Sequence, residues 1–449
     1  MRNIQCKPEQ LGELQFKNEY SVKYALYAGG MANGISSVNM VKELSENGFI
    51  GVLGIGGWDS QKIENSIDEL QSAHINFIVN VMPQRAALEK ELINLLIRKK
   101  VCKIEASAYI DPTPALVLFR VKGIFQNSSG ETVCKNKLIA KVSREEVALN
   151  FFMPPKQEIL DQLFSEEKIT VEEYKLAVKV PVASDITVEA DSGGHTDNRA
   201  LISILPEMIT LRDQIQDEKR YTDKVRVGAA GGISSGAAAA AAYSMGAAYV
   251  VTGSINQSCI EAGTSEYVKK LLCTANSADV IMAPAADTFE RGGKVQVLRK
   301  HTMYSGRAEA LFRLYRLYNS YFEIEKNIRN RLENQFFRAS FEEIWSEVIR
   351  YYEKKDKELL KNASNDSKMK MTLVFKWYLA STSQWAISGE EERKYDMQIW
   401  CGPSMGVFNK TIKNTILVDY KNRKVSEVNL LILKDAAMQI DDFFKSYRL

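Results

Sequence analysis

The stretch Ile186-Thr-Val-Glu-Ala-Asp-Ser-Gly-Gly-His-Thr-Asp197 joins an apolar, strand-like run to two adjacent glycines and one of only three histidines in the chain. Glycines lack Cβ atoms, so a flat ligand can approach the backbone closely where two of them follow a strand. A carboxylate and an imidazole then lie within reach of that ligand. We therefore interpret the end of this strand as the floor of a ligand site.

Other short runs rich in Val, Ile and Leu have the same form, and amphipathic segments of helical length separate them. Two of them, Val225–Ile233 and Tyr249–Ser254, end in small residues that offer backbone N–H groups to a phosphate. Together they give eight predicted strands: Tyr24–Ala28, Gly51–Gly56, Asn76–Val81, Cys102–Ser107, Lys137–Val142, Ile186–Ala190, Val225–Ala229 and Tyr249–Thr252.

Eight βα units in about 250 to 300 residues favour a closed (β/α)8 barrel over an open, doubly wound sheet. We expect an α/β fold in which residues 1–305 form this TIM barrel. An inserted hairpin is expected near residues 116–142, with arms at Val117–Lys122 and Lys137–Val142 on either side of a turn at Asn127–Gly130. Capping-box spacing at Ser143–Glu146 and Thr170–Glu173 predicts two helix starts, and Ser234 or Ser235 is expected to cap an alanine-rich helix.

The pattern changes after about residue 305. Apolar residues then recur at helical spacing from Leu311 to Phe322, and a similar helical pattern continues to about Leu360. Residues 362–368 are expected to be a loop. We expect residues 306–449 to form a mainly helical subdomain beside the barrel mouth.

Composition narrows the class of protein. The net charge of +3 gives no support for binding a nucleic acid, and no apolar run reaches the roughly 18 residues needed to span a bilayer. The polar amino terminus lacks a secretion signal, so we expect a cytoplasmic protein. The six cysteines show no C-x-x-C spacing and the three histidines lie far apart, so no metal site is expected.

Side chains at the strand ends are the candidates for function, because active groups of such barrels lie there. Gly29, Gly30 and Met31 follow the first strand. Asn80, in the third, either hydrogen-bonds a pyrimidine-like ring edge or is a satisfied buried amide. Lys141, in the fifth, requires a negative partner, which is either the edge of a reduced flavin or a salt bridge to Glu105 or Glu189.

His195 is the candidate catalytic residue, since it follows two glycines at a strand end and Asp191 or Asp197 could tune it. Gly231, Gly232, Gly253 and Ser254 match the phosphate cradle of such barrels, for an FMN phosphate or a metabolite phosphate. The glycines of Leu53–Trp58 do not form a dinucleotide fingerprint, because Asp59 stands where the third glycine belongs.

Four segments carry a likeness to a known family: Tyr27-Ala-Gly-Gly-Met-Ala-Asn-Gly34, Ile186–Asn198, Val227-Gly-Ala-Ala-Gly-Gly-Ile233 and Ile399-Trp-Cys-Gly-Pro-Ser-Met-Gly-Val-Phe-Asn409. They resemble the PfaD family, the trans-acting, FMN-dependent enoyl reductases of polyketide and polyunsaturated fatty acid synthases. In the wider superfamily, which includes nitronate monooxygenases, the histidine is usually followed by x-Gly. Here Thr196-Asp197-Asn198 follows, which favours the PfaD branch.

The resemblance implies reduction of α,β-unsaturated thioesters on an acyl carrier protein, with FMN as cofactor, NADPH or NADH as hydride donor and His195 facing the substrate. A homodimer is a further possibility. The alternatives are a nitronate monooxygenase-type flavin oxidase and a non-redox phosphate-binding barrel or assembly partner. The implied FMN-binding residues are Gly29, Gly30, Met31, Asn80, Lys141, Asp191, Gly193, Gly194, Gly231, Gly232, Gly253 and Ser254.

Six arginines of the C-terminal part remain with two interpretations. They are either a solvated helix face or a docking surface for an acidic carrier protein. The six are Arg307, Arg313, Arg316, Arg329, Arg331 and Arg338.

Overall fold

The structure is a computed structural model and describes residues 6–446. Eight parallel strands close into a barrel in the order β1-β10-β9-β8-β7-β4-β3-β2, which confirms the expected fold. All eight predicted strands are present, and no bound differs from its prediction by more than about two residues. The strands are β1 (Leu26–Ala28), β2 (Ile50–Gly54), β3 (Phe77–Val81), β4 (Lys103–Ala106), β7 (Lys137–Val142), β8 (Asp185–Glu189), β9 (Arg226–Ala230) and β10 (Val250–Thr252).

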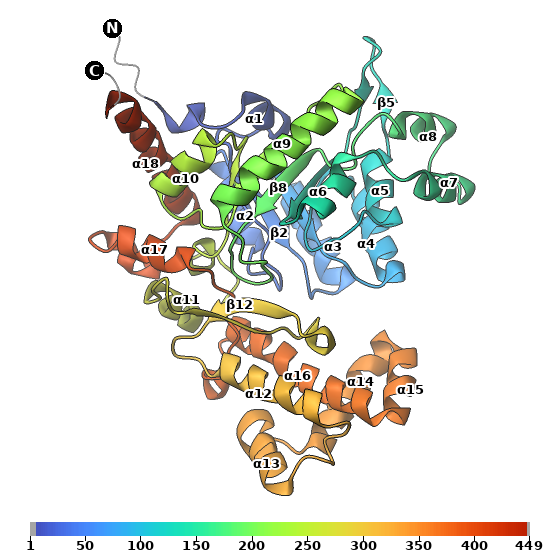
Figure 1. The fold of residues 1–449 in the computed structure, drawn as a ribbon, viewed down its shortest axis with the longest axis vertical. Coiled ribbons are helices and arrows are strands. Elements are labelled where there is room, and N and C mark those ends of the chain that lie inside the picture. The colour runs from blue at the N-terminus through green and yellow to red at the C-terminus, as the bar shows by residue number, and fades with distance from the viewer. Residues whose placement is uncertain (1–5, 447–449) are drawn as a thin grey trace. The chain divides into compact units, whose positions relative to one another are not determined.

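Helices follow the strands around the barrel (Figure 1), and several of them are amphipathic and bury one face. In α3, for example, Ile63, Ile67 and Leu70 are buried at helical spacing. The helices of this part are α1 (Leu14–Tyr20), α2 (Val38–Glu46), α3 (Ser60–Ser72), α4 (Ala86–Arg98), α5 (Pro114–Val121), α6 (Glu145–Phe152), α7 (Gln157–Ser165), α8 (Val171–Ala177), α9 (Leu201–Lys219) and α10 (Gly236–Ser244), with η1 (Pro8–Gln10) before them and η2 (Asn256–Ser258) after β10.

The helix starts agree with the sequence in two cases of three. Thr170 and Glu173 form the expected capping box of α8, and the Ser235 hydroxyl accepts from an amide of α10. The prediction for Ser143 was wrong, because Arg144 precedes α6 without a side-chain cap. The Ser143 hydroxyl instead donates to Asp197 at 2.5 Å.

The inserted hairpin is smaller than expected. β5 (Phe125–Gln126) and β6 (Thr132–Val133) pair antiparallel across the predicted turn. The expected first arm, from residue 117, lies in α5 instead, where Thr113 caps the helix and Pro114 occupies its first turn. Every residue from Leu116 to Val121 is buried, so apolar periodicity could not distinguish a strand from a helix there.

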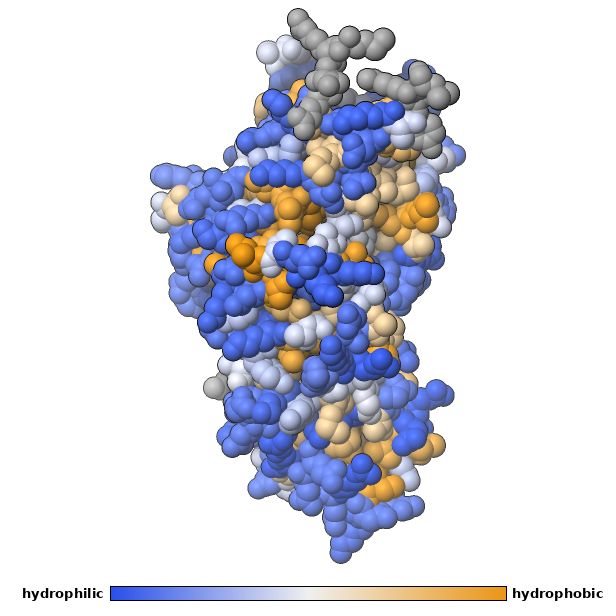
Figure 2. Space-filling view, turned by 90° about the vertical axis from the view of Figure 1, so that its left-hand side faces the viewer, coloured by the Kyte–Doolittle hydropathy of each residue, from blue (hydrophilic) through white to orange (hydrophobic). Residues whose placement is uncertain are grey.

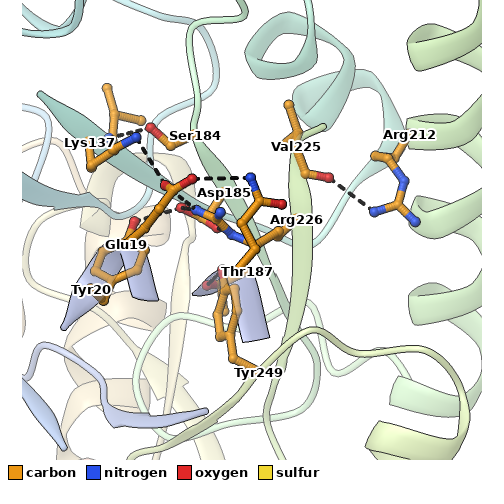
Figure 3. Close-up of polar contacts among 12 residues, drawn as sticks. Glu19, Tyr20, Lys137, Ser184, Asp185, Thr187, Arg212, Val225, Arg226 and Tyr249 are labelled. Carbon is orange, nitrogen blue, oxygen red and sulfur yellow. Dashed lines mark hydrogen bonds and ion pairs between the residues drawn. The ribbon is translucent and has the colours of Figure 1, made fainter. Parts of the chain in front are cut away.

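A charged cluster closes the amino-terminal end of the barrel (Figure 3). Arg226, at the start of β9, pairs with the buried Asp185 of β8 at 2.5 Å, and its guanidinium also contacts Glu19 at 3.0 Å. Tyr20, at the end of α1, donates to Asp185 at 2.6 Å, and Lys137 of β7 pairs with Glu19 at 3.0 Å. These ion pairs and hydrogen bonds hold the amino-terminal end of the barrel together, whereas active groups of such barrels lie at the carboxyl-terminal rim.

The chain divides into two compact units, and the division differs from the boundary expected after residue 305. Of the described residues, the barrel unit contains 6–192, 196–263 and 404–446. It thus includes η6 (Ile416–Val418), η7 (Tyr420–Asn422), α17 (Ser404–Thr411) and α18 (Val425–Ser446). The reason is that α18 packs beside α10, where the Asp435 carboxylate accepts from the amide of Gly236 at 3.0 Å (Figure 1).

The second unit contains Gly193–His195 and Thr264–Pro403. A β-hairpin of β11 (Val280–Pro284) and β12 (Lys294–Leu298) joins a helical core. Its helices are α11 (Glu266–Cys273), α12 (Tyr304–Leu317), α13 (Lys326–Arg331), α14 (Phe341–Lys355), α15 (Lys357–Asn365) and α16 (Ser367–Ser388), with the short 3-10 helices η3 (Phe289–Arg291) and η5 (Glu391–Arg393) and the π-helix η4 (Leu332–Phe337).

Two expectations for this unit were wrong. Asp366 alone separates α15 from α16 and caps the latter, so the predicted loop over residues 362–368 is mostly helical. Phe322 does not continue the apolar face of α12, since that helix ends at Leu317 and Phe322 is 61% exposed.

Apolar side chains also reach the surface. Figure 2 shows them gathered on a face of the barrel unit, and in α18 the exposed ones are Leu431, Met438, Phe443 and Phe444. Within residues 6–446, none of the helices has the length and apolar character needed to cross a membrane.

Candidate functional site

The carboxyl-terminal ends of the barrel strands bring together the rim residues that the sequence singled out. Because the strands are parallel and adjacent in one closed sheet, residues that follow them meet at the same rim. The rim residues of the barrel unit are Gly29, Gly30, Met31, Asn80, Lys141, Asp191, Gly231, Gly232, Gly253 and Ser254. The remaining candidates, Gly193, Gly194 and His195, belong to the second unit.

Glu105 of β4 organises one side of this rim. Its buried carboxylate accepts hydrogen bonds, each 2.9 Å long, from the Tyr27 hydroxyl, the Gly30 amide and the Asn80 side-chain amide. The Asn80 amide also donates to Ser107 at 2.8 Å. The side-chain nitrogen of Asn80 is therefore satisfied within the protein, as one of the two interpretations of this residue expected. The sequence suggested Glu105 only as a partner for Lys141 and missed this role.

Lys141 projects from β7 and pairs with Glu189 of β8 at 2.8 Å. Burial by itself would lower the pKa of this ammonium group, but the charges of Glu189 and Glu105 outweigh it and raise the pKa. Lys141 is therefore a cation throughout the physiological range. Of the two accounts that the sequence left open, the structure shows the salt bridge, and Glu189 is its partner.

The glycines after β9 and β10 differ in what surrounds them. A Cβ at Gly231 would lie 2.6 Å from the backbone of Ala190, so tight packing alone requires glycine there. At Gly232 and Gly253 a Cβ would meet nothing within 4 Å. Both therefore border open space. The buried hydroxyl of Ser192 has no hydrogen-bond partner among the residues that the structure describes.

These observations fit a phosphate group at the rim. Backbone N–H groups in small-residue turns after β9 and β10 attract anions, and the space beside Gly232 and Gly253 leaves room for one. An unpartnered buried hydroxyl, such as that of Ser192, is the kind of group that a ligand satisfies. The residues present therefore fit the phosphate-bearing cofactor that the sequence implied.

The segment Gly193–His195 is held by the second unit through backbone hydrogen bonds. The Gly194 amide donates to the carbonyl of Gln296 in β12 at 3.0 Å, and the Gln296 amide donates back at 2.7 Å. A Cβ at Gly193 would lie 2.9 Å from the backbone of Cys401, so glycine is needed there for packing. Gly194, with φ of +83°, borders open space instead.

His195 has a carboxylate partner that the sequence did not indicate. Its Nε2 lies 2.8 Å from Oδ2 of Asp287, in the loop after β11. The carboxylates expected to tune it have other partners: Asp197 pairs with Arg144 at 2.9 Å, and Asp191 accepts from Asn198 at 2.7 Å. The hydrogen bonds of Asp197 with Arg144 and Ser143 lower the pKa of Asp197 to about 2, against the effect of burial.

The arginines of the second unit do not form one continuous solvated face. Arg307 is half-buried and forms an ion pair with the buried Asp396, and Arg329 lies over the ring of Phe322. Arg313 and Arg316 are exposed on α12 beside the exposed Leu317. Only part of the predicted set is thus suited to docking. Among the described residues, no group of three or more His, Cys, Asp or Glu side chains is placed to hold a metal ion.

Two family models match the chain. The model described as nitronate monooxygenase matches residues 15–335. The model described as the inserted helical domain of [acyl-carrier-protein] S-malonyltransferase matches residues 318–397, which lie in the second unit. The first match covers more than half of the sequence. This chain belongs to the nitronate monooxygenase family.

Within the family, the chain is similar to proteins of polyketide and fatty acid synthesis. The crystal structure of the enoyl reductase domain of MlnA, from the macrolactin biosynthesis cluster of Bacillus amyloliquefaciens, has a TM-score of 0.93 and 36% identity, and covers 98% of this chain and 99% of that one. This family member is therefore similar over nearly its whole length to that enoyl reductase domain, in line with the resemblance seen in its sequence.

Two longer proteins are each 41% identical to this family member. One is the polyketide biosynthesis protein PksE of Bacillus subtilis (strain 168), of which the match covers 58%, with 99% of this chain. The other belongs to the polyunsaturated fatty acid synthase of Thraustochytrium sp., and the match covers 30% of it, with 96% of this chain. The chain thus spans less than two thirds of the length of either relative.

Proposed function

We propose that this chain is an enoyl reductase that uses FMN and NADPH or NADH to reduce α,β-unsaturated acyl thioesters on an acyl carrier protein. The observation that carries this proposal is the likeness, over 98% of the chain, to the enoyl reductase domain of MlnA. The polyketide and fatty acid synthase proteins among the relatives favour a role in such a synthase.

We propose that FMN is held at the barrel rim, with its phosphate at the turns after β9 and β10. The open space beside Gly232 and Gly253 supports this placement. Bound FMN would supply the hydride, received from the nicotinamide, to the β-carbon of the thioester. The residues proposed to hold FMN are Gly29, Gly30, Met31, Asn80, Lys141, Asp191, Gly193, Gly194, Gly231, Gly232, Gly253 and Ser254.

Lys141 and His195 would then stabilise the negative charge and supply the proton that the reaction needs. Lys141 keeps a positive charge at the rim, which would stabilise an anionic form of the cofactor. As hydride reaches the β-carbon, the alkene π bond breaks, negative charge develops on the thioester oxygen and the α-carbon must gain a proton. We assign that proton to the His195 imidazolium, which afterwards recovers one from water. A general acid of this kind contributes on the order of 10²-fold or more to the rate.

The test has two readouts on the purified chain. We expect it to be yellow with bound FMN and to reduce crotonyl thioester with NADPH or NADH. His195→Ala should keep the flavin and lose about 100-fold or more in the rate. A colourless protein that does not bind added FMN would overturn the cofactor assignment. Reduction at the parental rate by His195→Ala would overturn the role of the histidine.

A second candidate is oxidation of alkyl nitronates, because the nitronate monooxygenase model matches residues 15–335. Such an enzyme passes electrons from its flavin to oxygen and needs no nicotinamide. Oxygen uptake with an alkyl nitronate in the absence of NAD(P)H would favour it. An absence of uptake, together with crotonyl thioester reduction, would favour the enoyl reductase.

We propose α12 as the docking surface for the carrier protein. Arg313 and Arg316 are exposed there beside the apolar Leu317, which suits an acidic, amphipathic partner. The double variant Arg313→Glu/Arg316→Glu should raise KM about tenfold for carrier-bound substrate and leave the free thioester unaffected. Arg350→Glu, at an exposed arginine of α14 in the same unit, is the matched control. Equal KM values in all three proteins would exclude this surface.

Two expectations from the sequence remain proposals. A homodimer is tested by light scattering during gel filtration, in which a mass near 50.6 kDa would indicate a monomer. A cytoplasmic location is tested by fractionating cells that produce the protein.

A further inference from the structure

The position of His195 depends on residues far from it in sequence. The paired hydrogen bonds between Gly194 and Gln296 attach the histidine segment to β12. The Gln296 carbonyl also accepts from the Cys401 amide at 3.3 Å, and the Leu298 amide donates to Ile399 at 2.8 Å. Residues 193–195 and 399–401 thus both hydrogen-bond to β12, which holds the backbone that carries the imidazole.

The carboxylate of Asp287 is oriented through both of its oxygens. Oδ1 accepts from the Thr288 amide at 3.0 Å and from the Thr288 hydroxyl at 3.4 Å, and Oδ2 lies 2.8 Å from Nε2 of His195. A carboxylate in this position favours a proton on Nε2 and stabilises the imidazolium form. The effect is mutual: burial would raise the pKa of Asp287, but the hydrogen bond and charge of His195 lower it.

Two other ionisable groups of the second unit, Tyr304 and Lys294, have partners of their own. Tyr304, at the start of α12, is buried and donates its hydroxyl to the Pro284 carbonyl at 2.7 Å, and burial and the charge of Asp287 raise the pKa of Tyr304, so it stays neutral. Lys294 of β12 pairs with Glu309 of α12 at 3.8 Å. Asp287 is a charged group in direct contact with the imidazole, at 2.8 Å from Nε2.

We propose that Asp287 is a positioning residue that fixes the orientation and the protonation of the His195 imidazole for proton delivery to the substrate. The inference rests on the proposed function, in which His195 is the general acid. It assigns to Asp287 the part played by a carboxylate next to a catalytic histidine, which retains the proton on Nε2 and stabilises the imidazolium form.

The first test does not depend on turnover. The chain has three histidines, so an NMR pH titration of protein with nitrogen-15-labelled histidine is simple, and His195→Ala identifies the signal of His195. In Asp287→Asn we expect the pKa of His195 to be lower by about one, because an opposite charge has been removed. Glu290→Gln, at an exposed carboxylate of η3 three residues away, is the control and should leave it unchanged.

The second test uses the reaction. In Asp287→Asn we expect kcat near neutral pH to fall about tenfold, KM for the thioester to stay the same, and the loss of activity at high pH to begin at lower pH. Asp287→Glu should restore part of kcat. A purely structural role would instead lower thermal stability without moving the pH profile.

The outcomes separate the two proposals. An unchanged His195 titration in Asp287→Asn overturns the role of Asp287, whatever the enzyme reduces. A parental protein that reduces no enoyl thioester overturns the proposed function, whereas the titration still tests the contact. If Asp287→Asn does not fold, the same titration is made with Asp287→Glu, which keeps the carboxylate. A pKa of His195 equal to that of the parent supports the assignment, and a clearly lower pKa contradicts it.

Discussion

Glu105 Oε1 accepts a hydrogen bond from the backbone amide of Gly30 at 2.9 Å, so the interior of β4 holds the loop that follows β1. A Cβ at Gly30 would lie 2.8 Å from the same oxygen and 2.5 Å from Cβ of Asn80. The first, third and fourth strands therefore depend on one buried carboxylate for the shape of the rim.

Glu105→Gln should damage both stability and cofactor binding. The substitution replaces an acceptor of three hydrogen bonds by an amide that itself donates, so buried donors lose their partner. We expect the free energy of unfolding to fall by about 3 kcal/mol, measured by urea unfolding. The FMN retained per chain after gel filtration should fall as well. Glu91→Gln, at an exposed residue of α4, should change neither.

Gly253→Ala separates folding from binding. A Cβ there meets no atom within 4 Å, so the variant should unfold at the parental temperature. If a phosphate lies beside this backbone, the added methyl group should weaken FMN binding at least tenfold, measured by fluorescence titration. Gly306→Ala, which also adds a methyl group in open space but on α12, should bind FMN normally. If Gly253→Ala binds FMN as tightly as the parent does, the phosphate does not lie beside this turn.

A double-mutant cycle distinguishes the two roles of Lys141. Lys141→Met leaves the Glu189 carboxylate without its cation and should cost about 3 kcal/mol of stability. Adding Glu189→Gln should recover most of that loss. If Lys141 also contacts FMN, the double variant regains stability but not FMN affinity. Recovery of both would make the salt bridge its entire role.

The free energy of unfolding should fall in acid because the Glu19 carboxylate becomes protonated. Salt bridges and hydrogen bonds to Arg226 and Lys137 outweigh burial and lower the pKa of Glu19 from 4.5 to about 2. A carboxyl whose pKa is depressed on folding stabilises the protein above its unfolded pKa, and the contribution is lost as pH falls towards 2. The contribution at neutral pH is about 3 kcal/mol.

Unfolding in urea between pH 5 and pH 2 measures this contribution. Glu19→Gln should be less stable than the parent at pH 7, and the difference should vanish near pH 2. Glu207→Gln, at an exposed residue of α9, should follow the parental curve throughout. A constant difference between Glu19→Gln and the parent at all pH values would contradict the assignment.

Local patterns account for what the sequence predicted well. The runs from Lys137 to Val142 and from Asp185 to Glu189 are short, apolar and bounded by polar residues, which is the pattern of strands buried on both faces. Parallel strands point in the same direction, so the residues at their carboxyl ends could be placed at one rim. Lys141 of β7 and the glycines after β9 are examples. The same reasoning failed for residues 117–121, because every residue of this helical segment is buried and the segment has no apolar periodicity.

The sequence by itself determined the barrel, its eight strands and most of the residues that follow them at the rim, because each βα unit is encoded by neighbouring residues. The tertiary structure alone decided that α18 packs with the barrel unit, that Gly193 is required by the backbone of Cys401, and that His195 meets Asp287, 92 residues away. Hydrogen bonds and close contacts between distant segments leave no periodicity in the chain, so only the folded backbone brings their partners together.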